Sequence, residues 1–447
     1  MKPRRLLALF KSYADIIITS VLATYIAIIG WNYYDVSYFI GWYNEYFKTG
    51  RLLEVYTSDL KVAYPPLAVI LFVSTHAVAV HFFGENIIAA RLIDKIPLLA
   101  SFIAVYFILR RNVSRLASYL WLLTFEIYNV ILSYQFDPLA SLFLLLALLS
   151  FERGKYGWGG LYIALASLFK QVLGILLVIP MIYLYRGKES RELVKLLSVV
   201  SVVVAIVVMP FLMASPLAFI DKIMFYHAKR PPQYLSLWAI PIYASGYDQG
   251  MIDLSQQISS YWIIFFLVYI VMVCFYAYRE AVGSARGYYV KHFTLLTIGL
   301  LLFNKVGNTN YFLWLAPLLI VFISRIGNSV VKKRLVFAYV FTSLLIGVLF
   351  GFLSGYVHLI AGIEYIFIFE DFKWIPSQKF LYDCIGSDPF NLNYRAVLYL
   401  HSINAVREGA ASLAVVHHYL IVCIIIVYVV ILVYFIKSLY KYGLQID

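Results

Sequence analysis

The sequence predicts an all-α integral membrane protein, and three observations predict it. Hydrophobic residues make up 63% of the 447 residues and charged residues only 13%, whereas about a quarter of the residues in a soluble domain are charged. The mean hydropathy is +0.84. Apolar stretches of bilayer-crossing length recur from 14–31 to 413–436. Lipid is therefore the solvent for most of the fold, and we expect a single membrane domain over residues 1–447.

Basic residues fall in short clusters between the apolar stretches, and these clusters predict the topology. The formal net charge of +13 is spread over clusters such as 2–5, 110–115, 185–195 and 324–334. They form no continuous basic face, which argues against a nucleic-acid partner. If all the clusters are cytoplasmic, each apolar stretch between neighbouring clusters crosses twice. This requires roughly twelve spans in a multi-pass cell-membrane protein with both termini in the cytoplasm.

The opposite face then carries the longer segments. They are a first external loop over 32–88, a second external loop over 214–257 and a small cap segment over 355–412. A helix beginning at Pro65 and Pro66 in the first loop is long and apolar enough to cross, but a crossing would move every later basic cluster outside. We therefore expect this helix to lie in or dip into the outer leaflet.

Asp35 is the first candidate for chemistry. The stretch WNYYDVSYFI follows the first span directly and predicts that Asp35 lies at the water interface among Tyr and Trp side chains. A partly desolvated carboxylate is a better proton acceptor near neutral pH, so Asp35 is the candidate general base. The alternative is an ordinary first-turn aspartate that faces solvent. Glu45 and Asp59 are rival bases at weaker positions.

Lys305 is the second candidate, because it interrupts two apolar runs in FNKVGNTN. Gly307 and the asparagines favour a tight turn that exposes backbone N–H groups, and Lys305 adds a point charge at the interface. Such a turn suits an anionic head group, most simply a phosphate. The alternative is a lysine that anchors the end of a span by reaching to the membrane surface.

Further cations reach the same face in this topology. Lys170 follows an apolar run and is followed by Gln171, and Lys229 and Arg230 come shortly after His227. Together with Lys305, these cations come from distant parts of the sequence and run against the positive-inside trend. We therefore expect one phosphate site at the depth of the outer leaflet.

Other polar residues are expected to be structural. Asp137 precedes an apolar run, where an ordinary helix-start residue is expected. Arg91 and Asp94 have i,i+3 spacing and are expected to pair with each other. His76 and His81 are five residues apart, which misses the i,i+4 spacing of a helical metal site. We expect no metal and no cofactor.

Five short motifs carry a resemblance to a known family. The acidic YYDVSYF after the first span, the following YPPL and the later AARL resemble the layout of the GT-C glycosyltransferases. FNKVGNTNYFLWLAPLL is similar to a segment of the catalytic subunit of GPI mannosyltransferase I and of related prokaryotic lipid-linked mannosyltransferases. SLFKQVLGILLVIP is also of a type found in them.

This resemblance implies a GT-C-like helical bundle that transfers a hexose, expected to be mannose, from a polyprenyl phosphate such as dolichyl phosphate mannose. It implies inversion at the outer membrane face with Asp35 as general base. Two departures stand out: Ser37 replaces the second carboxylate of a paired acidic motif, and Tyr64 replaces a basic residue before the two prolines. The residues expected to hold the donor phosphate or sugar are Lys305, Arg230, Lys229, Lys170, Gln171, Tyr64, His227, Asn304 and Asn310.

The expected partners follow from this reaction. They are the polyprenyl-phosphate donor, membrane lipids and an acceptor that is a glycolipid, a glycan or a protein. A small membrane subunit is compatible with this reaction. The alternative function is a transporter or flippase of a lipid-linked or anionic substrate. Internal repeats and helices broken near the midplane would favour that alternative, but here the polar groups gather at one interface.

Overall fold

Apolar helices dominate the computed structural model, as the composition predicts. The structure describes residues 3–226, 230–246, 248–281, 285–363, 366–368, 373–375 and 377–444. His227 and Lys229, two of the predicted donor-binding residues, lie outside the described residues.

The first half of the chain folds into helices joined by short turns. In order they are α1 (Pro3–Ile29), α2 (Tyr33–Gly41), η1 (Trp42–Phe47), η2 (Leu52–Thr57), α3 (Pro66–Phe83), α4 (Ile87–Asn112), α5 (Arg115–Leu122), α6 (Glu126–Ser133), α7 (Asp137–Glu152), α8 (Tyr156–Phe169), η3 (Gln171–Leu177), α9 (Val178–Arg186), α10 (Ser190–Ala214), α11 (Pro216–Ile220) and η4 (Asp221–Phe225).

The second half adds two small strand pairs to the helices. Its elements are β1 (Gln233–Tyr234), η5 (Leu237–Ala239), α13 (Ile240–Ala244), α14 (Gln249–Ser259), α15 (Trp262–Glu280), α16 (Ala285–Phe303), β2 (Val306–Gly307), η6 (Thr309–Tyr311), α17 (Phe312–Arg325), α18 (Ser329–Leu344), η7 (Leu345–Phe350), η8 (Phe352–Tyr356), α19 (Val357–Ala361), β3 (Ile366–Ile368), β4 (Lys373–Ile375), α20 (Ser377–Ser387), α21 (Leu392–Ser402) and α22 (Asn404–Tyr442).

The helical membrane architecture predicted from the sequence is confirmed. Among the described residues, 6 helices are long and apolar enough to cross a membrane, or up to 8 if each of two bent helix pairs is one span. Three further apolar helices, at 156–169, 171–186 and 309–325, are shorter than this criterion. A total of roughly twelve spans stays a prediction.

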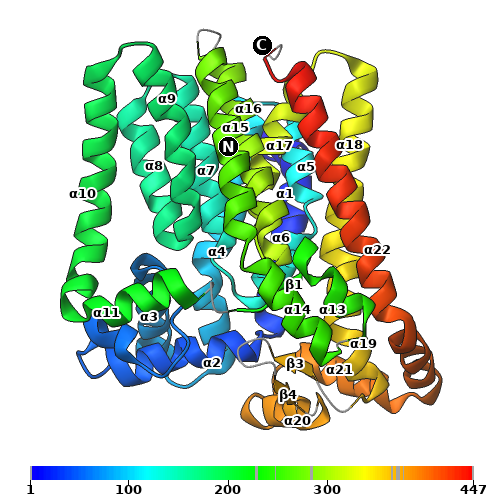
Figure 1. Cartoon of the computed structure of the whole chain (residues 1–447). Coiled ribbons are helices and arrows are strands. Elements are labelled where there is room, and N and C mark those ends of the chain that lie inside the picture. The colour runs from blue at the N-terminus through cyan, green and yellow to red at the C-terminus, as the bar shows by residue number, and fades with distance from the viewer. Residues whose placement is uncertain are drawn as a thin grey trace.

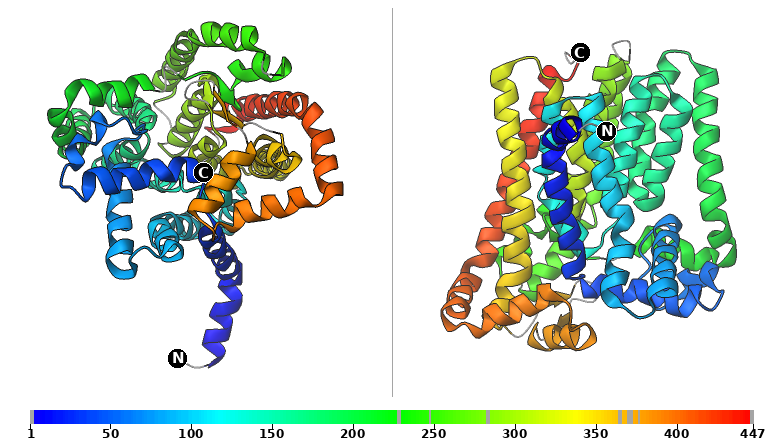
Figure 2. Two further views of the ribbon diagram at one scale, coloured as in Figure 1. Left: turned by 90° about the horizontal axis from the view of Figure 1, so that it is seen from below. Right: turned by 180° about the vertical axis from the view of Figure 1, so that it is seen from behind.

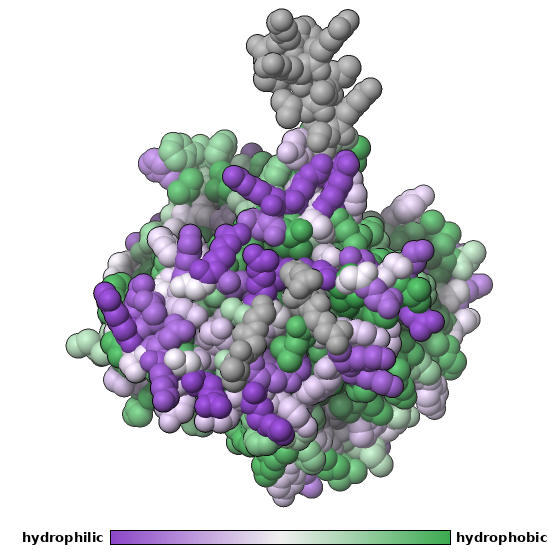
Figure 3. Space-filling view, turned by 90° about the horizontal axis from the view of Figure 1, so that it is seen from above, coloured by the Kyte–Doolittle hydropathy of each residue, from purple (hydrophilic) through white to green (hydrophobic). Residues whose placement is uncertain are grey.

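The two ends of the bundle differ (Figure 1). The upper end in that view carries the C-terminus and the short connections from α9 to α10 and from α17 to α18, and polar side chains gather on it when it is seen from above (Figure 3). The lower end carries α2, α3, α11, α14, α20 and α21 (Figures 1 and 2). The longer segments of the sequence thus gather at one end.

Helix α3 belongs to this lower end and packs against α4 and α8. It begins with Pro66 in the first helical position, as expected of a proline at a helix start. By length and composition α3 qualifies as a span. Its placement in the outer leaflet stays a prediction.

A sharp bend positions α2. The axis turns by 72° between the helix that ends at Ile29 and the helix that begins at Tyr33. Asn32 caps the new helix, because its side chain accepts a hydrogen bond from the backbone N–H of Tyr34 at 3.3 Å. The bend directs α2 away from the spans and along the lower end of the bundle.

The predicted pairing of Arg91 with Asp94 is wrong. Arg91 instead forms a fully buried ion pair with Asp388 of the cap segment. Asp94 accepts a contact from His76 of α3, at 2.9 Å between Nδ1 and Oδ2. Both partners come from other elements, because these charges lie inside the bundle, where only tertiary contacts can compensate the loss of water.

Candidate active site

Asp35 lies in the first turn of α2, where its carboxylate is held by three side chains. Lys61 donates to Oδ1 at 3.0 Å. Gln135 donates to Oδ2 at 2.6 Å, and Asn32 makes a longer contact of 3.5 Å with the same oxygen. The carboxylate side chain is 12% exposed. Asp35 is thus held in one orientation and keeps a small accessible surface. The alternative, an ordinary first-turn aspartate that faces solvent, does not describe it.

The rival acids differ from Asp35 in their surroundings. Glu45 and Asp59 are both exposed, so solvent screens their charges. Among the acids predicted for the first external loop, Asp35 is the one that is itself buried. It therefore remains the candidate base.

Tyr64 links Asp35 to the rest of the site. Its hydroxyl donates to the Gln135 side-chain carbonyl at 2.9 Å, and the same amide donates to Asp35. Burial raises the pKa of Tyr64 well above its ordinary value, with Asp35 and Asp137 adding to the rise. The hydroxyl therefore stays protonated and keeps its role as a donor. Where the family resemblance would place a basic residue, this chain has a neutral link.

Lys170 is not an unpaired cation. It follows the C-terminal end of α8 in extended conformation, and its ammonium lies 3.3 Å from Oδ2 of Asp137. It also lies over the rings of Tyr64 and Tyr311, at 5.0 and 5.7 Å from their centroids. The carboxylate of Asp137 offsets the charge of Lys170, which reduces what this lysine can offer to a phosphate.

Asp137 is a buried hub rather than an ordinary helix-start residue. It begins α7, as predicted, but it is fully buried. Besides Lys170, it accepts hydrogen bonds from the Asn310 amide at 2.6 Å and from the Trp314 indole at 2.7 Å. The amide group of Asn310, which was predicted to bind the sugar donor, therefore donates to Asp137 in the structure.

A two-residue parallel strand pair joins the Arg230 and Lys305 segments. Gln233 donates its backbone N–H to the Lys305 carbonyl at 3.1 Å, and Leu235 donates to the Gly307 carbonyl at 2.9 Å. Val306 and Gly307, which were predicted to lie in a tight turn, form the short strand β2 instead. A Cβ on Gly307 would lie only 2.2 Å from the Ser236 backbone nitrogen, so glycine permits this close approach.

Arg230 and Lys305 form the cationic part of the site. Both are buried, with exposed fractions of 9% and 3%. Burial and the neighbouring charge of Arg230 lower the pKa of Lys305 to about 8. Arg230 donates to the Gln233 side-chain carbonyl at 3.0 Å, which is a neutral partner, and its Nε has no hydrogen-bond partner in the described part of the chain. Two like charges held together in this way favour an anion between or beside them.

The cation pair and Asp35 belong to one cluster. The Asp35 carboxylate is among the groups whose charges act on Arg230, together with the side chain of Tyr311. Tyr64 interacts electrostatically with Asp35, Asp137 and Arg230. The structure thus brings together residues that are far apart in the sequence, since Asp35 and Lys305 are 270 positions apart.

The remaining predicted residues have local structural contacts. Asn304 accepts a hydrogen bond from the Val306 backbone N–H at 3.0 Å and so shapes the loop of Lys305. Gln171 donates to the Ile223 carbonyl at 3.0 Å and ties η3 to η4. Contacts of both residues with a donor stay predictions.

Sequence reasoning missed Lys61, Gln135 and Asp137 as site residues. Lys61 and Gln135 lie in polar stretches at the ends of apolar runs, which is the signal that drew attention to Asp35 and Lys305. Neither residue type is distinctive there. Their pairing with Asp35 appears only when segments 26 and 100 residues apart come together.

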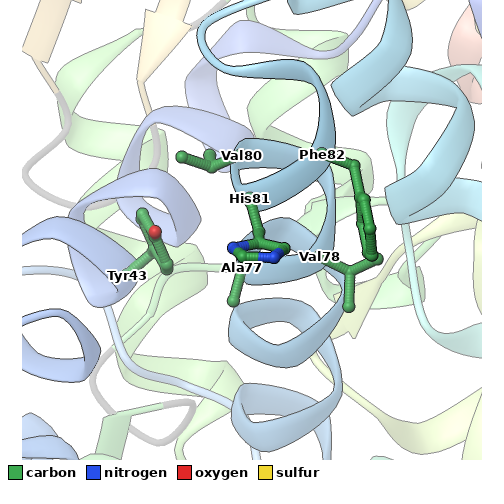
Figure 4. A pocket seen from close by; sticks show the side chains of 6 residues that line it. All are labelled: Tyr43, Ala77, Val78, Val80, His81 and Phe82. Atoms are coloured by element: carbon green, nitrogen blue, oxygen red, sulfur yellow. The ribbon is translucent and has the colours of Figure 1, made fainter.

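A hollow on the outer side of α3 is not this site. It has a volume of about 510 Å³ and is lined by Tyr43, Ala77, Val78, Val80, His81 and Phe82 (Figure 4). None of the acids and cations described above lines it. Among the residues that the structure describes, no three His, Cys, Asp or Glu side chains come together as a metal site.

Two crystal structures of one enzyme are similar to the whole chain. ArnT from Cupriavidus metallidurans in the apo state shares 15% identity with a TM-score of 0.47, covering 99% of this chain and 78% of that chain. ArnT bound to undecaprenyl phosphate shares 13% identity with a TM-score of 0.44, covering 98% and 78%. No curated protein matches the sequence significantly.

A family model gives the stronger result. The model of glycosyltransferase family 87 matches residues 63–304, which include Tyr64, Asp137, Lys170 and Arg230. Lys305 lies one residue beyond that range, and Asp35 lies 28 residues before it. The expectation of a membrane glycosyltransferase of the GT-C type is confirmed at this level. Because the match covers more than half of the chain, the protein belongs to glycosyltransferase family 87.

Proposed function

We propose that this glycosyltransferase moves a hexose, mannose in the first instance, from a polyprenyl-phosphate carrier to a hydroxyl acceptor. The observation that carries the proposal is the buried pair of Arg230 and Lys305 beside an oriented, accessible Asp35. A cation pair in a poorly hydrated site is suited to a phosphate leaving group, and a carboxylate within the same cluster is suited to proton abstraction.

The reaction is a single displacement with inversion. An oxygen of Asp35 takes the proton of the acceptor hydroxyl, and the acceptor oxygen forms the new bond to the anomeric carbon. The bond from that carbon to the phosphate oxygen breaks, and polyprenyl phosphate leaves with one more negative charge. Arg230 and Lys305 stabilise this developing charge. The proton then passes from Asp35 to water.

The contacts of Asp35 fit a base of this kind. Oδ2 already accepts from Gln135 and Asn32, whereas Oδ1 accepts from Lys61 alone in the part of the chain that the structure describes. A carboxylate oxygen can accept two hydrogen bonds, so Oδ1 keeps a position for the acceptor hydroxyl. Lys170 acts at a distance in this scheme, because Asp137 already neutralises it.

The site belongs to the outer membrane face in this proposal, with both termini in the cytoplasm. The basic clusters of the short connections support that orientation by the positive-inside rule. The acceptor is a glycolipid, a glycan or a protein, and a small partner subunit is compatible with the reaction.

Transfer in reconstituted vesicles tests the proposal. Labelled polyprenyl-phosphate mannose and a lipid extract as acceptor source are supplied to wild type, Asp35→Asn and Lys305→Ala, with Asp59→Asn as matched control in the same loop. We expect Asp35→Asn to lose about 10²–10⁴-fold in rate, Lys305→Ala to lower kcat/KM for the donor, and Asp59→Asn to behave as wild type.

Each component of the proposal has its own contrary result. Full activity of Asp35→Asn would remove Asp35 as the base. Transfer from a nucleotide sugar but from no polyprenyl-linked sugar would remove the donor class. Movement of the lipid-linked donor across the bilayer without transfer would favour the transporter or flippase alternative.

A further inference from the structure

Lys95 of α4 holds two helix ends together from inside the bundle. Its side chain is fully buried. The ammonium donates to the carbonyls of Ala27 at 3.0 Å and Gly30 at 2.7 Å, and to the carbonyl of Leu132 at 2.8 Å. All three hydrogens of the ammonium therefore have an acceptor.

The acceptors of Lys95 lie at helix C-termini. Ala27 belongs to the last turn of α1 and Gly30 follows that turn, while Leu132 belongs to the last turn of α6. The last four carbonyls of a helix have no partner within the helix, and a cation there also compensates the negative end of the helix dipole. Lys95 does this for two helices at once.

The candidate base Asp35 and its hydrogen-bond donor Gln135 lie shortly after these two helix ends. Asp35 lies five residues beyond Gly30, and Gln135 lies three residues beyond Leu132. The Gln135 amide then meets Asp35 Oδ2 at 2.6 Å. We propose that Lys95 is a positioning residue, which fixes the separation of α1 and α6 and thereby aims Asp35 through Gln135. The inference rests on the proposed role of Asp35 as the base.

Other contacts keep these segments folded without Lys95. The Phe39 ring of α2 packs against Tyr134 and Phe136, on either side of Gln135, with ring centroids 5.9 and 5.8 Å apart. Arg91, one helical turn before Lys95, donates to the Ile28 carbonyl and so holds α1 as well. Loss of Lys95 is therefore expected to loosen the alignment of Asp35 rather than to unfold the helices.

Steady-state kinetics in vesicles and thermal unfolding in detergent test this inference. The variants are Lys95→Met, Gln135→Ala, the double variant and Asp35→Asn. Arg325→Met is the control, because it also removes a cation that links two helices. Arg325 of α17 pairs with Glu152 of α7, and this pair includes neither Asp35 nor Gln135. Lys95→Gln, which keeps two N–H donors, replaces Lys95→Met if that variant does not fold.

We expect Lys95→Met to lower kcat by about 10–100-fold with the donor KM within about twofold of wild type, because misplacement by about 1 Å costs this much. Gln135→Ala is expected to do the same, and the double variant to lose no more than the more severe single variant. Arg325→Met is expected to lower the unfolding temperature without this loss of kcat.

Three results would overturn the inference. The first is a double variant whose fold-loss of kcat equals the product of the losses in Lys95→Met and Gln135→Ala. The second is a loss of kcat in Arg325→Met as large as that in Lys95→Met, when both variants unfold at the same temperature. The third is an inactive Asp35→Asn beside a fully active Lys95→Met. An active Asp35→Asn would instead show that the proposed base is wrong, so the two failures are distinguishable.

Discussion

The charge of Lys305 makes donor binding depend on pH in a way that the structure specifies. Burial and the adjacent Arg230 lower the pKa of Lys305 to about 8. The ammonium is present below this pH and is lost as the pH rises through it. The fraction charged falls from about 90% at pH 7 to about 10% at pH 9. If the ammonium holds the donor phosphate, kcat/KM for the donor falls about tenfold over this range.

Two substitutions test the assignment of this alkaline limb, and each is expected to change it in its own way. Lys305→Arg keeps its charge throughout, because a guanidinium has a pKa above 12, so the tenfold fall should disappear even if the absolute rate is lower. Arg230→Gln removes a charge that depresses the pKa of Lys305. In that variant the limb should move to higher pH, while the overall rate falls because a cation is missing from the site.

The assay is transfer from labelled polyprenyl-phosphate sugar in vesicles at subsaturating donor, over pH 6.5 to 9.5. Under this condition the rate reports kcat/KM and therefore the free enzyme. At saturating donor the limb should lie at higher pH, since a bound phosphate stabilises the ammonium. Lys332→Arg is the matched control, because Lys332 lies in α18 and donates to the Ser324 carbonyl, away from the site.

Two results would refute this reasoning. A tenfold alkaline fall that persists in Lys305→Arg would assign the limb to another group. A limb that stays in place in Arg230→Gln would show that the two cations do not interact. A shift in Lys332→Arg would indicate a general effect of Lys-to-Arg substitution on the vesicle assay.

Two further predictions concern the parts that hold the site. Gly307→Ala places a Cβ 2.2 Å from the Ser236 nitrogen, so β1 and β2 must separate. We expect kcat/KM for the donor to fall at least about tenfold. Gly327→Ala is the control and should not lower kcat/KM, because a Cβ there meets nothing within 4 Å. Asp137→Asn leaves the Lys170 charge uncompensated and should lower the free energy of unfolding by about 3 kcal/mol, measured by denaturation in detergent. Adding Lys170→Gln should recover most of that loss. No recovery would show that Asp137 does not stabilise the fold through its pair with Lys170.

Sequence reasoning found the parts of the fold that depend on local pattern. Hydropathy and the basic clusters predicted the helical membrane architecture, because lipid demands long apolar helices with satisfied backbones. Asp35 and Lys305 were detectable because each is a charged residue at the end of an apolar run. Arg230 was linked to Lys305 only by the predicted topology, and the structure joins them through β1 and β2.

The missed features depend on contacts between distant segments. Arg91 satisfies the i,i+3 pattern with Asp94, yet its partner is Asp388, 297 residues away. Asp137 has the position of an ordinary helix start, and only the approach of Lys170 and Asn310 makes it a hub. Local spacing cannot distinguish these cases, because a buried charge is paired with whichever opposite charge or dipole the packing brings to it.

The pairing of charges across the site explains where a phosphate would bind. Lys61 is matched by Asp35 and Lys170 by Asp137, so each of these lysines already has a carboxylate. Arg230 instead meets the neutral Gln233 and raises the cost of keeping Lys305 charged. A ligand phosphate at these two residues would relieve that repulsion, whereas at the paired lysines it would compete with a carboxylate. The polar pairs thus hold the site in shape, and a bound phosphate would stabilise the ammonium of Lys305 against the charge of Arg230.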